Sequence, residues 1–304
     1  MIYTITFSPS IDYVIKSNKE FNSCGLNRIN DFDIFCGGKG INASVVLKRI
    51  GFDSRVITFT GGKTKNFFYD LLKQENLEVI NFEVEDNTRI NVKYFGDNNS
   101  FEINGPRTNI SENRINELLA FISCFNKDDI VFIMGVCKQD HLIKLVDALN
   151  KNNVEFVLDV DLENNLEVLN YKPFIIKPNL DELQRMLNIT INSENDILNS
   201  MKKLISLGCK NVMVSNGKDG SYLLTKNNTF YKVKIDEIQG IKSTVGAGDT
   251  LISSFVCLYK NTNNVYDSLL KATSLSIGTS CSMWLAKNED IDKFKNKIKI
   301  YKNI

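Results

Sequence analysis

The middle of the chain alternates short apolar segments with longer segments of helical periodicity. Residues 130–134 (IVFIM) are wholly apolar, residues 142–149 carry apolar side chains at helical spacing, and residues 154–158 form the next strand-like segment. The same order returns at residues 174–176 and 180–187. Strands that are apolar on both faces are typical of a parallel sheet with helices on each side. The sequence therefore predicts an α/β fold.

Other segments of the chain also have strand character. Residues 1–7 and 211–214 have the composition of buried strands, and residues 221–233 have that of a hairpin. Residues 28–35 and 88–103 instead alternate apolar and polar side chains, as half-exposed antiparallel strands do. We expect these last two segments to form a small sheet that projects from the main body.

The composition narrows the possible partners. Among 304 residues, Lys and Arg total 37 and Asp and Glu total 36, so the net charge is +1. A nearly neutral chain lacks the basic surplus that binds nucleic acid or an anionic membrane. No apolar run reaches the length of a spanning helix. With only four prolines and no Gly/Ser linker, one domain over residues 1–304 is expected.

The cysteines and the histidine exclude further classes of site. The seven cysteines are scattered without metal-ligand spacing, as is typical of reduced thiols in the cytoplasm. The first residues lack the pattern of a signal peptide, so a cytoplasmic protein is expected. His141 is the only histidine, which argues against a histidine-rich metal site or a Ser-His-Asp triad. We expect it on the surface of a helix.

A glycine-rich segment before a helix is the most informative motif. Residues 245–250 read VGAGDT, and an apolar helical pattern follows. Small residues at the start of a helix let backbone N–H groups approach an anion, and the helix dipole favours negative charge there. Asp249 would repel such an anion, unless its task is to accept a proton from an attacking hydroxyl. Stabilisation of the helix by an early acidic residue is an equal alternative from this hexapeptide alone.

A second glycine cluster opens another predicted helix. Residues 36–42 read CGGKGIN, in which Lys39 supplies a cation and Asn42 supplies hydrogen-bonding groups. The spacing is not that of a Walker A loop, and no Ser or Thr follows the lysine. Taken alone, a tight strand-to-helix turn with a solvated lysine explains the cluster better.

Five motifs in this order resemble those of the ribokinase-like sugar kinases, over nearly the whole chain. Residues 7–13 (FSPSIDY) resemble the family's first strand and its substrate-hydroxyl aspartate, and residues 37–42 its sugar-binding signature. Residues 177–183 (KPNLDEL) are similar to its Asn-x-x-Glu element, and residues 214–220 (VSNGKDG) to its nucleotide-side turn. Residues 246–249 are similar to its anion hole and catalytic base.

The resemblance implies a ribokinase-like three-layer α/β sandwich with a mostly parallel sheet. It also implies a small β-sheet lid, from about residues 12–35 and 88–104, through which two copies would form a homodimer. ATP would be the phosphoryl donor and Mg²⁺ the metal. The implied site residues fall into four groups. They are Asp249, Gly246, Ala247 and Gly248 for catalysis; Asp12, Gly37, Gly38, Lys39, Asn42, Arg89 and Arg28 for the substrate; Lys177, Asn179, Ser215, Gly217 and Gly220 for the nucleotide; and Asn179 with Glu182 for Mg²⁺, through water.

Within this family, residues 88–93 and 102–106 look most like those of 1-phosphofructokinases. We therefore expect ATP-dependent conversion of fructose 1-phosphate to fructose 1,6-bisphosphate, with tagatose-6-phosphate kinase as the alternative. A sugar phosphate would explain three cations, Arg89, Arg28 and Lys39, in one pocket. For Asn179 and Glu182, reciprocal capping of a helix is a competing interpretation at this spacing.

Two segments depart from the family pattern. The family carries Ser-Gly-Ser-Leu-Pro after the strand at residues 130–133, whereas this chain has Val136 where a hydroxyl is expected. Residues 102–108 lack the second glycine expected after Pro106. These departures leave a catalytically weak sugar-phosphate-binding protein as an alternative, against which the intact 246–249 segment argues. An NAD-binding oxidoreductase is disfavoured because no G-x-G-x-x-G turn follows the first strand.

Overall fold

The computed structural model describes residues 1–17, 21–22, 24–96, 100–163 and 165–303. Within these ranges, a ten-stranded sheet has the order β14-β13-β12-β11-β10-β9-β8-β1-β4-β5. The strands from β5 to β11 run parallel, and β12, β13 and β14 continue the sheet antiparallel. Their bounds are β1 (Ile2–Thr6), β4 (Ser54–Thr58), β5 (Glu78–Asn81), β8 (Ile130–Met134), β9 (Glu155–Asp159), β10 (Ile175–Ile176), β11 (Val212–Ser215), β12 (Ser221–Leu224), β13 (Phe230–Ile235) and β14 (Ile298–Lys302).

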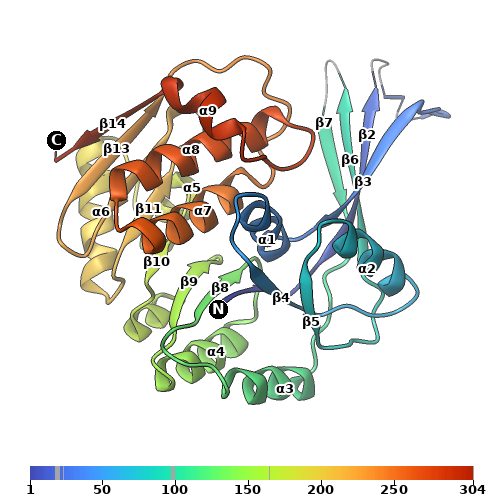
Figure 1. Cartoon of the computed structure of the whole chain (residues 1–304), viewed down its shortest axis with the longest axis horizontal. Coiled ribbons are helices and arrows are strands. Elements are labelled where there is room, and N and C mark those ends of the chain that lie inside the picture. Colours follow the sequence, from blue (N-terminus) through green and yellow to red (C-terminus); the bar gives the residue numbers. More distant parts are fainter. Residues whose placement is uncertain (18–20, 23, 97–99, 164, 304) are drawn as a thin grey trace.

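Helices cover both faces of this sheet (Figure 1). Alternation along β8 shows why, because Val131 and Ile133 pack into one core while Phe132 and Met134 pack into the other. The predicted mostly parallel three-layer fold is therefore confirmed. One face is covered by α3 (Glu112–Ile122), α4 (Gln139–Lys151), α5 (Leu180–Leu187) and α6 (Glu194–Ser206). The other face is covered by α1 (Lys39–Arg49), α2 (Lys65–Gln74), α7 (Ala247–Thr262), α8 (Val265–Cys281) and α9 (Asp290–Phe294). Short 3₁₀ helices span Leu166–Tyr171, Gly217–Asp219 and Lys295–Lys297.

A second sheet projects from this body, as predicted (Figure 1). It contains β3 (Asp31–Gly37), β2 (Ser10–Ser17), β6 (Arg89–Gly96) and β7 (Ser100–Asn104), in that order. We call this sheet the lid. Residues 18–20, 23 and 97–99 of the predicted lid lie outside the described residues.

The lid is mixed rather than purely antiparallel as expected. β2 pairs antiparallel with β3, and β6 with β7, but β2 and β6 run parallel. The reason lies in the main sheet, where β1, β4 and β5 are parallel neighbours. Because β2 follows β1 and β6 follows β5, both segments leave the same edge of the sheet and enter the lid in the same direction.

The expectation that His141 lies on the surface is wrong, because its side chain is only 4% exposed. It lies in the first turn of α4, and its Nε2 is 2.8 Å from Oε1 of Glu112 at the start of α3. The ring therefore joins two helices on the outer layer, far along the chain from the glycine-rich motifs. Within the described residues, every helix is too short or too polar to cross a bilayer.

Candidate active site

The start of α7 has the geometry of an anion site. Gly246 precedes the helix with φ 79°, and a Cβ there would come within 2.8 Å of Leu285. Any other residue would therefore be strained in both backbone and packing. The N–H groups of Gly248 and Asp249 lie in the first turn, where a helix offers them no internal acceptor. They remain available to an incoming negative charge.

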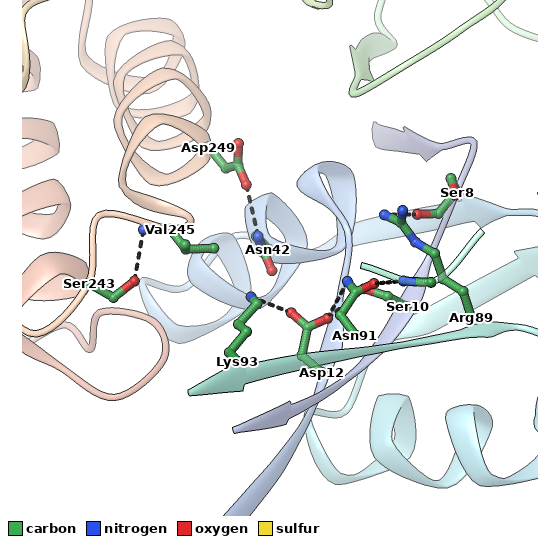
Figure 2. A network of polar contacts seen from close by, with 11 residues as sticks. Ser8, Ser10, Asp12, Asn42, Arg89, Asn91, Lys93, Ser243, Val245 and Asp249 are labelled. Atoms are coloured by element: carbon green, nitrogen blue, oxygen red, sulfur yellow. Dashed lines mark hydrogen bonds and ion pairs between the residues drawn. The ribbon is translucent and has the colours of Figure 1, made fainter. Parts of the chain in front are cut away.

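Asp249 is held at this helix start as a buried carboxylate. Its side chain is 5% exposed, and its Oδ2 accepts a hydrogen bond from Nδ2 of Asn42 at 2.8 Å (Figure 2). Burial and the nearby charge of Asp159 raise the pKa of Asp249 to about 6, against the opposing effects of Lys39, Asn42 and Lys177. A carboxylate with such a pKa is a stronger proton acceptor than an exposed aspartate.

Asp159, at the end of β9, is the residue that the sequence motifs did not reveal. Its Oδ1 is 3.4 Å from Nζ of both Lys39 and Lys177, while its buried Oδ2 has no hydrogen-bond partner among the described residues. Burial opposes ionisation, but the two lysines lower the pKa of Asp159 below its usual value. The available signal was its position directly after a predicted strand, since the carboxyl ends of parallel strands meet at one edge.

A cavity of about 810 Å³ opens in front of α7. One end is polar and is lined by Lys39, Lys177 and residues 246–249. Apolar side chains such as Ile235, Ile238 and Ile277 line another part. The structure thus brings the predicted nucleotide residues into one cavity; they are Lys177, Asn179, Ser215, Gly217 and Gly220.

Asn179 and Glu182 form a reciprocal cap at the start of α5. Oδ1 of Asn179 accepts from the Glu182 backbone N–H at 2.8 Å, and Oε2 of Glu182 accepts from the Asn179 backbone N–H at 2.8 Å. The capping interpretation is therefore correct. Both residues also line the cavity, so capping orients them there and does not exclude a second role.

The lid presents a polar face opposite α7. Asp12 on β2 is 5% exposed, and its carboxylate accepts from Ser10, Asn91 and Lys93 at 2.7, 2.9 and 2.6 Å (Figure 2). The chain at Gly37 passes so close that an added Cβ would lie 2.5 Å from Asp12. Asn91 and Lys93 belong to the segment 88–93 that was compared with the family in the sequence. Their contact with Asp12 depends on the pairing of β2 with β6, which the sequence does not show.

The helix start that follows Gly37 connects this face to Asp249. Gly38 has φ 122°, and a Cβ at Gly40 would collide with Ile5 and Thr6 of β1. Glycine at these positions lets α1 begin directly against the sheet, so that Asn42 reaches Asp249. The two glycine motifs are thereby joined by one hydrogen bond between residues 207 positions apart.

The pfkB family carbohydrate kinase profile matches residues 6–279. The chain belongs to this family. A 1-phosphofructokinase from Bacillus subtilis is 33% identical, with 99% of each chain covered, and a D-tagatose-1-phosphate kinase from Bacillus licheniformis is 30% identical with the same coverage. A solved structure of a candidate phosphofructokinase from Staphylococcus aureus gives a TM-score of 0.86 at 33% identity, covering 100% of this chain and 99% of the other.

Membership of this carbohydrate kinase family confirms the predicted fold and enzyme class, and it implies ATP as the phosphoryl donor. The three cations expected in one pocket are not brought together within this chain. Lys39 lines the 810 Å³ cavity, whereas Arg28 lines an adjoining cavity of about 580 Å³ with Lys16 and Lys242, and the two cavities share only Ile241. Arg89 lines neither, and its Nη2 donates to the Ser8 carbonyl at 3.2 Å.

Proposed function

We propose that this pfkB-family kinase phosphorylates the free primary hydroxyl of a ketose 1-phosphate, with fructose 1-phosphate as the preferred substrate and fructose 1,6-bisphosphate as the product. The observation that carries the proposal is the position of Asp249. This buried carboxylate faces the nucleotide cavity and is joined through Asn42 to the helix start that supports the lid's polar face. The identity to a 1-phosphofructokinase over nearly the whole chain supports the substrate.

Asp249 would act as the base. As the O6 hydroxyl attacks the γ-phosphorus, an O–P bond forms, the bond to the ADP oxygen breaks, and the proton passes to the carboxylate. The backbone N–H groups of Gly248 and Asp249 would stabilise charge on the transferred phosphoryl group, whereas that of Ala247 already donates to the Thr244 carbonyl. Lys39 and Lys177 add positive charge to the same end of the cavity.

Asp12 and the residues around it would orient the sugar. With its oxygens already accepting from three side chains, the Asp12 carboxylate is fixed in one orientation before a substrate arrives. Lys93 uses one of its three donors on Asp12, so the others remain for sugar hydroxyls. Arg89 would bind the 1-phosphate, because its planar guanidinium suits phosphate oxygens.

The oxygen donors around the cavity fit a hydrated Mg²⁺. Within the described residues, no cluster of three or more His, Cys, Asp or Glu forms a metal cage. Mg²⁺ is commonly bound by one or two carboxylates, waters and substrate phosphates instead. Glu182 lines the cavity with its Oε1 outside the cap, and Asp159 lies behind Lys39 and Lys177 with an unpartnered Oδ2 among the described residues, so these two would offer such carboxylates. The ion would neutralise charge on the ATP phosphates, and Asn179 would orient its waters.

A second candidate substrate is D-tagatose 1-phosphate, supported by the 30% identity to a kinase of that name. It differs from fructose 1-phosphate only at C4, so the same phosphate and acceptor positions would be used. Membership of the carbohydrate kinase family argues against the catalytically weak sugar-phosphate-binding protein. An ATP-coupled assay of ADP release with free and phosphorylated ketoses tests these possibilities together.

We also propose a homodimer formed through the lid. The register places Tyr13 beside Val92, and Val92 beside Ile103, on the face opposite Asp12. Ile90 and Ile103 on this face are 48% and 60% exposed. The four-stranded sheet of the lid is thus polar on the face toward the site and apolar on the opposite face. Burial of the apolar face against the same face of a second copy would remove it from water.

A further inference from the structure

The loop after β7 carries a second arginine to the sugar side of the site. The backbone N–H of Gly105 donates to Oδ1 of Asn91 at 3.1 Å. The same glycine lies against β6 so closely that an added Cβ would be 3.1 Å from Cβ of Arg89. Arg107, two residues further on, is therefore held in the neighbourhood of Arg89.

A second anchor follows Arg107 immediately. The backbone N–H of Thr108 donates to Oγ of Ser8 at 3.4 Å, and the Ser8 carbonyl accepts from Arg89 at 3.2 Å. Ser8 thus contacts both the arginine of β6 and the loop that carries Arg107.

Several donors at this point have no acceptor. Nε of Arg89 and Oγ1 of Thr108 are buried and have no hydrogen-bond partner among the described residues. The Arg107 side chain is exposed and forms no ion pair with any of the residues that the structure describes. Burial lowers the pKa of Arg89, Asp12 opposes this, and the charge of Arg107 lowers the pKa further. An anion seated between the two guanidinium groups would offset their mutual repulsion and would accept hydrogen bonds from Nε of Arg89 and Oγ1 of Thr108.

The neighbouring strand end at the same edge of the sheet supplies no side-chain donor. β1 and β8 pair with Thr6 beside Met134, so that Ser8 and Val136 follow neighbouring strands at one edge. The Val136 side chain is 49% exposed and cannot donate a hydrogen bond. An anion seated beside Ser8 would therefore take its side-chain donors from β6 and from the loop after β7 rather than from Val136.

We propose that Arg107 is a second phosphate-binding arginine, which binds the 1-phosphate of the ketose together with Arg89 and Thr108 and thereby offsets the missing hydroxyl at Val136. The inference rests on the proposed function, because it assigns the phosphate subsite of that reaction. It makes Arg107 a specificity-determining residue for phosphorylated over free sugars.

The test compares Arg107→Ala with the parent enzyme and with Arg114→Ala, which removes an exposed arginine paired to Glu117 on α3. Loss of one charge-assisted contact should raise the KM for fructose 1-phosphate about tenfold in Arg107→Ala. The KM for ATP and kcat should stay at the parent values, and Arg114→Ala should match the parent throughout. Calorimetry without ATP should show the same loss for fructose 1-phosphate binding.

A compensating variant sharpens the test. Adding Val136→Ser to Arg107→Ala should recover about threefold in KM for the sugar phosphate, because the new hydroxyl can donate one hydrogen bond to the phosphate. If Arg107→Ala binds and turns over fructose 1-phosphate like the parent while Arg89→Ala does not, the role of Arg107 is refuted and the proposed function stands. If the parent prefers free fructose and neither arginine affects KM, both the inference and the proposed function fail.

Discussion

Asp249 owes its chemical character to its surroundings. An aspartate in water has a pKa of about 3.9, which makes it a weak base at neutral pH. In this site the pKa of Asp249 is raised to about 6, mainly by burial and to a smaller extent by the charge of Asp159. Lys39 and Lys177 limit this effect because they also pair with Asp159. The pKa of Asp249 is therefore raised while that of Asp159 is lowered, which is why we assign the role of base to Asp249.

This environment predicts the acid limb of the pH profile. The base works only when ionised, so kcat/KM for the sugar phosphate should be level above about pH 6 and fall about tenfold per pH unit below it. Asp249→Asn should lower kcat by about 10²–10⁴-fold and should no longer show this limb. Steady-state kinetics from pH 5 to 8 measures both. Activity that stays level down to about pH 4 would mean that Asp249 is not the base.

The stability of the same variant provides a folding control. Because the folded-state pKa of Asp249 lies above its unfolded value, the carboxylate favours folding when protonated, and this contribution is lost as pH rises through about 6. Asp249→Asn removes the buried charge. It should therefore melt no lower than the parent at pH 8, which separates a catalytic loss from misfolding.

At the scale of the element, the start of α5 combines a structural cap with a carboxylate in the cavity. Glu182→Gln keeps an oxygen for the Asn179 N–H but removes the charge, so the cap should survive. If Glu182 helps to hold Mg²⁺, the metal concentration for half-maximal activity should rise about 10–100-fold. Titration of activity with Mg²⁺ measures this.

The chain supplies a matched control for that variant. α6 begins with an equivalent reciprocal cap between Ser193 and Asp196, and neither residue lines the 810 Å³ cavity. Asp196→Asn should leave the Mg²⁺ dependence unchanged. Equal metal dependence in the parent and Glu182→Gln would reduce Glu182 to a helix cap.

The apolar face of the lid leads to a prediction about the oligomeric state. Ile103→Glu places a carboxylate on its apolar face, and burying that charge at a symmetric interface should weaken a dimer by about 100-fold or more. By light scattering, the variant should have the mass of one 34.5 kDa chain, whereas the parent should have twice that mass. Ile189→Glu changes an isoleucine 39% exposed outside the lid and should remain dimeric. A monomeric parent would exclude the lid dimer.

Across the whole molecule, local patterns predicted the elements well and the contacts between them less well. The apolar run at β8 and the helix at α5 were predicted with their observed bounds. The direction of β6 beside β2 was not, because antiparallel and parallel strands share the same alternation. The burial of His141 was missed for a similar reason, since the packing of α3 on α4 is not visible in either helix alone.

In the candidate site, too, the sequence predicted the local features better than the contacts between elements. Glycine motifs marked the starts of α1 and α7 because a backbone constraint leaves a local trace in the sequence. Asp159 leaves no such trace, and only the neighbouring strand ends bring it to Lys39 and Lys177. The convergence of Arg28 with Lys39 was expected from charge, but the two side chains line two adjoining cavities rather than one.

The most direct test of the whole account is the substrate preference of the purified enzyme with ATP and Mg²⁺. ADP release should be measured for fructose 1-phosphate, D-tagatose 1-phosphate, tagatose 6-phosphate, free fructose and ribose, as kcat/KM. Fructose 1-phosphate should exceed free fructose by about 100-fold or more, since charge-assisted hydrogen bonds to its phosphate contribute about 1.5–3 kcal/mol each. D-tagatose 1-phosphate should follow about tenfold lower, because one hydroxyl is inverted. A preference for free fructose or ribose, or no turnover with any ketose phosphate, would contradict the account.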